Sequence, residues 1–155
     1  MAEKQLLIVG HVPSVNTQRL RDAVEEGASS SNVTGVRVRA LSPFDAGPED
    51  LMNADGVILG TTENLGYMSG ALKDFFDRTY YDVLEKKQGM PYALYVRAGL
   101  DGTGTIRGVT SIATGLKWKA VAEPLWCRGD WQDSFVDEAR ELGILMSVGI
   151  ESGVF

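Results

Sequence analysis

The sequence has few of the residues that build disulfides, metal clusters and catalytic triads. Its 155 residues include one cysteine, Cys127, and one histidine, His11. A single cysteine excludes an intrachain disulfide and a cysteine-cluster metal site. One histidine alone makes neither a triad nor a metal site, and Cys127 has no base beside it in the sequence. We therefore expect no bound metal and no catalytic nucleophile, with Cys127 acting as a small hydrophobic residue.

Positive charge and long apolar runs are also scarce. Fifteen Lys and Arg residues stand against 21 Asp and Glu residues, a net charge of −6, which argues against a nucleic-acid partner. No apolar run approaches the length of a membrane span, and Met1–Gln5 opens no signal peptide. We therefore expect a cytoplasmic protein with no membrane partner.

Short apolar segments alternate with segments of helical spacing along the whole chain, and a chain of this length predicts one domain, residues 1–155. The expected strands are Gln5–Val9, Val36–Leu41, Val57–Leu59, Pro91–Val96 and Ala120–Cys127. The expected helices follow Thr17, begin near Pro48, run over Met68–Val83 and Ile106–Leu116, and close the chain over Asp133–Met146. This alternation predicts an α/β fold: a doubly wound sheet of five parallel strands in the order 2-1-3-4-5, with helices on both faces.

The stretch from Gly60 to Arg78 is the most specific in the chain. It reads Gly-Thr-Thr-x-x-x-Gly-x-Met-Ser-Gly-x-Leu-Lys-x-Phe-Phe-Asp-Arg, a polar loop followed by an amphipathic helix. It resembles the second flavin loop and following helix of flavodoxin-like FMN proteins. The nearest versions occur in NAD(P)H:quinone reductases of the tryptophan-repressor-binding-protein type and in NADPH-dependent FMN reductases. The resemblance implies FMN as cofactor, with loop contacts from Thr61, Thr62, Glu63, Asn64, Leu65 and Gly66.

This loop departs from the family pattern in two places. Thr62 stands where proline is usual, and Glu63–Leu65 lacks the usual aromatic residue. Tyr67 is adjacent and could cover the flavin in its place. If Tyr67 stays away, one face of the ring is open to a second molecule.

The first strand-to-helix turn allows two interpretations. Ser14, Asn16 and Thr17 lie where a helix needs an N-cap, and the same free N–H groups can hold a phosphate. Flavodoxin-like proteins bind the FMN phosphate at this turn, with a pattern near Ser/Thr-x-Ser/Thr-Gly-Asn-Thr. Ser14, Asn16 and Thr17 match that pattern, and Val15 replaces its glycine. The resemblance implies that Ser14–Thr17 binds the phosphate.

A third loop, Arg97–Thr105, follows the fourth strand and is rich in glycine. The resemblance makes it the third flavin contact, through Arg97, Ala98, Gly99, Asp101 and Gly102. The alternative is a glycine-rich loop that leads into a helix N-cap at Thr103 or Thr105. Glu63 and Asp101 either border the ring or lie in solvent as ordinary loop acids.

Three functions follow from the resemblance. The first is a two-electron, NAD(P)H-dependent FMN oxidoreductase that reduces a quinone or similar small acceptor; the flavin carries the chemistry, and no side chain is catalytic. The second is a one-electron carrier that docks to a redox partner protein. The third is a flavodoxin-like binding module that has lost the flavin. A homo-oligomer is compatible with all three.

Overall fold

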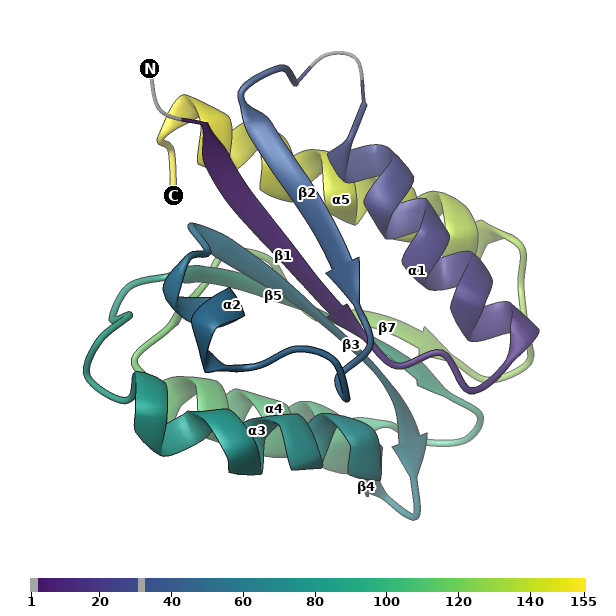
Figure 1. The fold of residues 1–155 in the computed structure, drawn as a ribbon. Helices are drawn as coiled ribbons and strands as arrows, with labels where there is room; N and C mark the ends of the chain where they lie inside the picture. Colours follow the sequence, from purple (N-terminus) through teal and green to yellow (C-terminus); the bar gives the residue numbers. More distant parts are fainter. Residues whose placement is uncertain (1–2, 31–32) are drawn as a thin grey trace.

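The computed structural model describes residues 3–30 and 33–155, which form a central sheet between two helical layers (Figure 1). The elements in chain order are β1 (Lys4–Gly10), α1 (Val15–Ala28), β2 (Val36–Leu41), α2 (Pro48–Met52), β3 (Gly56–Asn64), β4 (Tyr67–Met68), α3 (Gly70–Val83), β5 (Pro91–Ala98), α4 (Thr103–Gly115), β6 (Lys119–Ala120), β7 (Leu125–Arg128) and α5 (Ser134–Ser152).

The strand order of the sheet is β2-β1-β3-β5-β6, with β7 beside β5 as well. Every pair is parallel except β3 with β4, which is antiparallel. β6 and β7 together occupy the fifth place, so the predicted 2-1-3-4-5 order of a doubly wound sheet is confirmed. β2 is an edge strand, and Arg37 and Arg39 on it are exposed, as its alternating sequence predicts.

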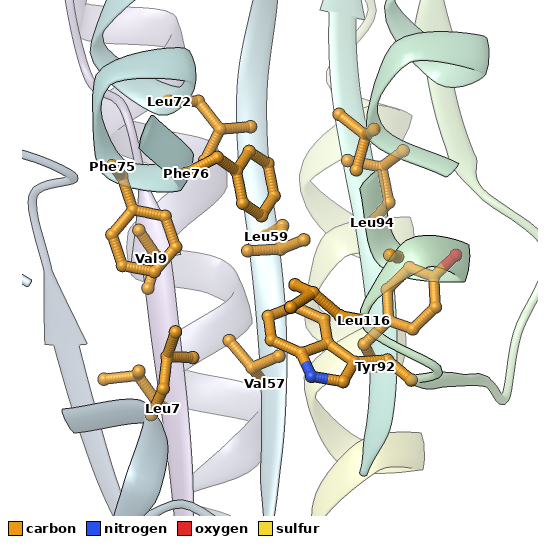
Figure 2. Packing of buried hydrophobic residues seen from close by; sticks show 14 of the residues in the cluster. Leu7, Val9, Val57, Leu59, Leu72, Phe75, Phe76, Tyr92, Leu94 and Leu116 are labelled. Atoms are coloured by element: carbon orange, nitrogen blue, oxygen red, sulfur yellow. The ribbon is translucent and has the colours of Figure 1, made fainter. Parts of the chain in front are cut away.

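Helices cover both faces of the sheet. α1 and α5 pack on one face, and α2, α3 and α4 pack on the other (Figure 1). Figure 2 shows the second face, where Leu72, Phe75 and Phe76 of α3 lie over the strand residues Val9 and Leu59. Because strands β1, β3 and β5 are covered on both sides, their sequences are continuously apolar rather than alternating. Their carboxyl ends meet at one edge of the sheet.

Two predicted elements differ from the structure. The predicted fifth strand, Ala120–Cys127, is interrupted: β6 and β7 both pair with β5, and Val121–Pro124 lies between them. The Val121 N–H still donates to the Tyr92 carbonyl of β5 at 3.2 Å, and the chain leaves the ladder after it. Pro124 has no N–H to donate, which favours this interruption. The last helix extends to Ser152 rather than Met146, because Ile150 continues its buried stripe.

Candidate flavin site

Three residues that pair with one another on neighbouring strands form the floor of the candidate site. Gly10 of β1 pairs with Gly60 of β3, and Gly60 pairs with Tyr95 of β5. The Tyr95 side chain crosses over Gly60 and its hydroxyl reaches Gly10, so a methyl group at either glycine would overlap it. The Tyr95 hydroxyl is buried without a hydrogen-bond partner in the described residues, and burial raises its pKa. The two glycines therefore make room for a large side chain beneath the three predicted loops.

The first loop contains a complete capping box at the start of α1. The Ser14 hydroxyl accepts a hydrogen bond from the Thr17 N–H at 3.2 Å, and the Ser14 N–H donates to the Thr17 hydroxyl at 3.0 Å. The two hydroxyl oxygens lie 2.9 Å apart, and Thr17 is only 3% exposed. Ser14 and Thr17 therefore satisfy each other. The N-cap interpretation is confirmed for Ser14, and Thr17 is its capping-box partner at the third helical position.

Val15 and Asn16 are arranged differently from the capping pair. They are the first two residues of α1, whose N–H groups have no partner within the helix. Val15 directs its side chain into solvent, 78% exposed, and its φ is not positive, so a β-branched residue costs nothing here. The first turn of α1 contains no acidic residue. Two free N–H groups at the positive end of a helix form a site for an anion.

His11, at the end of β1, is the polar residue nearest this loop without a partner. Its backbone N–H donates to the Gly60 carbonyl at 3.0 Å, and its ring meets Phe44 edge-on, with centroids 6.4 Å apart. Nδ1 is buried and has no hydrogen-bond partner among the described residues. Burial lowers the pKa of His11 below its ordinary value. A buried ring nitrogen without a partner is an exception in folded proteins, and a bound water or ligand would satisfy it.

The second loop is a β-hairpin, which corrects the predicted loop at Thr61–Gly66. β3 continues past Leu59 to Asn64 and turns back as β4. Thr62 pairs with Arg97 of β5, and a proline there would lack the N–H that a ladder residue can donate. The Thr61 hydroxyl accepts from the Ser69 N–H at 3.0 Å and fixes the base of the hairpin.

The hairpin tip is strained. Leu65 and Gly66 both have positive φ, 54° and 78°, which makes a tight two-residue turn. A left-handed backbone costs a non-glycine residue roughly 1–2 kcal/mol. The Leu65 side chain is nevertheless fully exposed to solvent. Strain and an exposed apolar side chain at one residue suggest a role in contacting a ligand or partner.

Tyr67 lies on α4. A methyl group at Gly108 would lie 2.5 Å from its ring, and the Gly66 carbonyl lies close against Gly104 in the same way. The hairpin is therefore seated on two glycines of α4, one turn apart. The Tyr67 ring packs against the helix instead of reaching back over the sheet edge.

The third loop is tied to the hairpin by Glu63. Its carboxylate accepts a hydrogen bond from the Gly102 N–H at 2.5 Å. Gly102 is the N-cap of α4 and has a φ of 96°, so the predicted alternative caps at Thr103 and Thr105 are wrong. The Asp101 carboxylate accepts from the Thr103 hydroxyl at 2.7 Å. Glu63 is thus part of the wall between two loops rather than a free acid in solvent.

Arg97 faces the α1–α5 side of the sheet, where its guanidinium lies over the Trp131 and Phe135 rings. Val96 and Ala98 face the α3–α4 side, and the intervening Arg97 faces α5. Its guanidinium donates to the carbonyls of Ala98 and Cys127 at 2.9 and 3.0 Å and lies 5.7 Å from the centroid of the Trp131 ring. In the structure Arg97 holds the ends of β5 and β7 together.

Cys127 packs as the small hydrophobic residue that the sequence predicts. Cys127 is fully buried, and burial raises the pKa of its thiol to about 12, which leaves it inert. Within residues 3–30 and 33–155, no three His, Cys, Asp or Glu side chains gather as metal ligands. No helix in those residues is long and apolar enough to cross a membrane.

Sequence reasoning missed the supporting residues of this edge. Tyr95 crosses between strands, and only the paired glycines at the ends of the first and third strands hint at it. Trp126 was also missed: its indole N–H donates to the Asp101 carbonyl at 2.7 Å and fixes the third loop. These roles depend on strand register, which leaves no local pattern, and on the interruption before β7, for which Pro124 is the one local signal.

The donor set at this edge fits a flavin mononucleotide. The N–H groups of Val15 and Asn16, which have no partner within α1, suit a phosphate. The hairpin continues β3 and the third loop follows β5, so both lie at the sheet edge where open α/β sheets bind ligands. Glycine at position 99 leaves its backbone open, because no atom lies within 4 Å of where a side chain would begin.

Comparison with known proteins agrees with this geometry. A family model described as NADPH-dependent FMN reductase matches residues 4–128. A flavodoxin from Aquifex aeolicus is 30% identical over 71% of this chain and 58% of its own length. An NAD(P)H dehydrogenase (quinone) from Acidithiobacillus ferrooxidans is 29% identical over 48% of this chain and 46% of its own length. The chain thus spans about half the length of these two relatives.

Solved structures share the fold across nearly the whole chain. A flavodoxin from the domain Archaea superposes with a TM-score of 0.81 and 20% identity, covering 94% of this chain and 98% of that one. A WrbA-like flavodoxin from Agrobacterium tumefaciens gives 0.73 and 18%, covering 97% and 99%. The fold is flavodoxin-like, and the chain belongs to the NADPH-dependent FMN reductase family of flavodoxin-like, FMN-binding oxidoreductases.

Proposed function

We propose that this protein is an NAD(P)H-dependent FMN oxidoreductase that passes two electrons to a quinone or a similar small acceptor. When bound, FMN supplies the redox chemistry, and the chain supplies anchoring, orientation and electrostatics. Two comparisons support this choice of reaction: one relative is named as an NAD(P)H dehydrogenase (quinone), and the NADPH-dependent FMN reductase model matches this chain. A cytoplasmic location and a single domain over residues 1–155 stay predictions.

The residues divide into two groups in this proposal. Val15 and Asn16 bind the phosphate through their N–H groups, and the Asn16 side chain adds a further polar contact. Ser14 and Thr17 hold the loop in the conformation that presents these groups. The hairpin Thr61–Gly66 forms one wall of the ring site. The stretch Ala98–Gly102 forms the other, with the N–H groups of Gly99 and Asp101 available to the ring edge. Arg97 contributes by fixing the end of β5.

The position of the Tyr67 ring is the observation that favours a two-electron oxidoreductase over a one-electron carrier. Its ring is seated on Gly108 of α4, and the hairpin offers no other aromatic side chain to lie over a bound ring. A nicotinamide or a quinone must stack on the ring to exchange two electrons with it. An uncovered ring face therefore favours an enzyme that binds both molecules in turn.

Anaerobic mixing of the FMN-loaded protein with NADPH tests this proposal. We expect the visible flavin absorption to bleach in a single two-electron stage and benzoquinone to restore it. Tyr67→Ala should leave both rates unchanged, since the ring of Tyr67 does not cover the site. Reduction by dithionite in two separate one-electron stages, without any reduction by NADPH or NADH, would contradict the proposal.

The one-electron carrier is the second candidate, because of the apolar surface at this edge. Val15, Leu65 and Leu100 are large apolar side chains, all well exposed, and each lies in a different loop around the site. Such side chains are common where a partner protein docks. The flavodoxin relative from Aquifex aeolicus agrees with this reading. Reduction of the flavin in one two-electron stage or in two one-electron stages distinguishes the oxidoreductase from the carrier.

A further inference from the structure

Two hollows lie one after the other along the outer side of α4, between that helix and the interrupted edge of the sheet. The first, of about 510 Å³, includes Arg107, Thr110 and Trp126 in its wall. The second, of about 440 Å³, is lined by Tyr92, Thr110 and residues 120–124, among others. The first lies beside β7 and the second beside β6, which pair with the later and the earlier part of β5. The two hollows therefore meet at Thr110.

The exposed side of α4 has very little charge for a surface helix. Arg107 is the one charged residue among the 13 of α4, whereas α3, on the same face of the sheet, has five among 14. The other exposed side chains of α4 include Thr103, Thr110, Ser111 and Thr114. The first hollow exposes almost only apolar surface. Few charges around an apolar hollow are typical of the centre of a protein interface.

Trp126 projects from β7 between these hollows and the flavin site and is held rigidly. Its indole N–H donates to the Asp101 carbonyl at 2.7 Å, and its ring packs against Gly102, where a methyl group would overlap it. The Arg128 guanidinium lies 5.1 Å from the centroid of the indole ring. Trp126 is still 37% exposed. A large aromatic side chain that is fixed before binding loses little entropy when a partner covers it.

Two opposite charges lie on either side of Thr110. Arg107 belongs to the wall of the first hollow, and Glu123 belongs to the wall of the second. Both are exposed, and neither forms an ion pair within residues 3–30 and 33–155. A surface with a cation on one side of a point and an acid on the other is complementary in charge to a copy of itself turned about that point.

We propose that a second copy of this chain docks on this face, with a two-fold axis beside Thr110 and at right angles to α4. Trp126 of each copy then fills the second hollow of the other, and Arg107 meets Glu123 of the partner subunit. The symmetry repeats both contacts. The contact is coupled to the flavin site, because Trp126 and Arg128 donate to the carbonyls of Asp101 and Leu100 in the third loop.

Sedimentation equilibrium of charge-reversal variants tests this dimer. We expect the wild type to have twice the mass of one chain at micromolar concentration. Arg107→Glu and Glu123→Arg should each weaken dimerisation about a hundredfold, since each places like charges together at two symmetric contacts, with about tenfold lost at each. The double variant should restore the dimer. Arg37→Glu is the matched control and should leave it intact, because Arg37 is exposed on the opposite edge strand, β2.

Cross-linking tests the position of the axis independently of the charges. A residue beside a two-fold axis lies opposite its own copy, so Thr110→Cys should give a disulfide-linked dimer under mild oxidation, whereas Arg37→Cys should not. The native Cys127 is fully buried and gives no background. A monomeric wild type would overturn the inference and leave this face for a different partner. A dimer that both single charge variants leave unchanged, or one that the double variant fails to restore, would also overturn it.

Discussion

The two ends of the candidate flavin site are built by different means. The phosphate end is a local structure: Ser14 and Thr17 are three residues apart and satisfy each other. The ring end is assembled from distant segments: Glu63 reaches Gly102, and Trp126 reaches Asp101. The phosphate end can therefore be read from neighbouring residues, whereas the ring end exists only once the strands have paired. Each prediction below separates the two ends or tests the floor that they share.

The largest effect is expected at the shared floor. Gly60→Ala should lower the free energy of unfolding by about 3 kcal/mol, the upper range for overpacking a buried site, because the new methyl group overlaps the Tyr95 ring. Denaturant unfolding measures the loss. Gly99→Ala is the matched control, since a side chain there meets no atom within 4 Å. Equal stability of the two variants would show that Tyr95 is free to move.

The next largest effect distinguishes the residues that bind the phosphate from those that cap α1. Asn16→Ala should weaken FMN tenfold to a hundredfold, or about 1.5–3 kcal/mol, by removing a polar neighbour of the phosphate. The same variant should leave the melting temperature unchanged. Fluorescence titration of FMN, compared with the melting of the apoprotein, measures both.

Thr17→Ala should show the reverse pattern at the same end. Its hydroxyl belongs to the capping box and is buried, so its loss should cost about 1 kcal/mol of unfolding free energy. The effect on FMN should be smaller than that of Asn16→Ala. A stable Thr17→Ala protein that has lost FMN binding would assign the hydroxyl to the phosphate instead of to the cap.

The ring end contains a strained residue whose replacement should stabilise the protein. Leu65→Asn should raise the free energy of unfolding by about 1 kcal/mol, because asparagine tolerates positive φ better than leucine. Leu100→Asn is the control, an exposed leucine whose φ is not positive. Denaturant unfolding of both variants measures the difference. A gain in both, or in neither, would mean that the hairpin tip stores no strain.

The smallest effect is a pH dependence at His11. Its folded pKa lies below the unfolded value of about 6.5, so the unfolded chain binds the extra proton first. Stability should therefore fall as pH drops through 6.5 toward the folded pKa. His11→Gln should flatten this part of the profile, as measured by denaturant unfolding at pH 7.5 and 5.5. An identical slope in the variant would place the titration elsewhere.

The fold was predictable from the sequence wherever local spacing determines it. The apolar runs of β1, β3 and β5 and the stripe Leu72, Phe75 and Phe76 predict strands, helix and order correctly. The hairpin after Leu59 was not predictable, since Thr61 and Thr62 become strand only by pairing with β5. The interruption before β7 was missed for a similar reason. Pro124 is the one local signal of it.

The candidate site was predictable to a different degree in each loop. The pattern Ser14–Thr17 identifies the turn, although the structure assigns Ser14 and Thr17 to the cap and leaves the free N–H groups to Val15 and Asn16. The Arg97 side chain faces α5, because side chains alternate along β5, and its contact with the flavin stays a prediction. Alternation is a simple rule, but it needs the register of the strand, and that register is set by its neighbours.

Comparing FMN with riboflavin tests the central claim most directly, because the two ligands differ only in the phosphate. The measurement is quenching of flavin fluorescence by the apoprotein, with wild type and Asn16→Ala titrated side by side. The account predicts that the wild type binds FMN at least tenfold more tightly than riboflavin, and that Asn16→Ala narrows this gap. Equal affinity for FMN and riboflavin, or no quenching of FMN at micromolar protein, would contradict it.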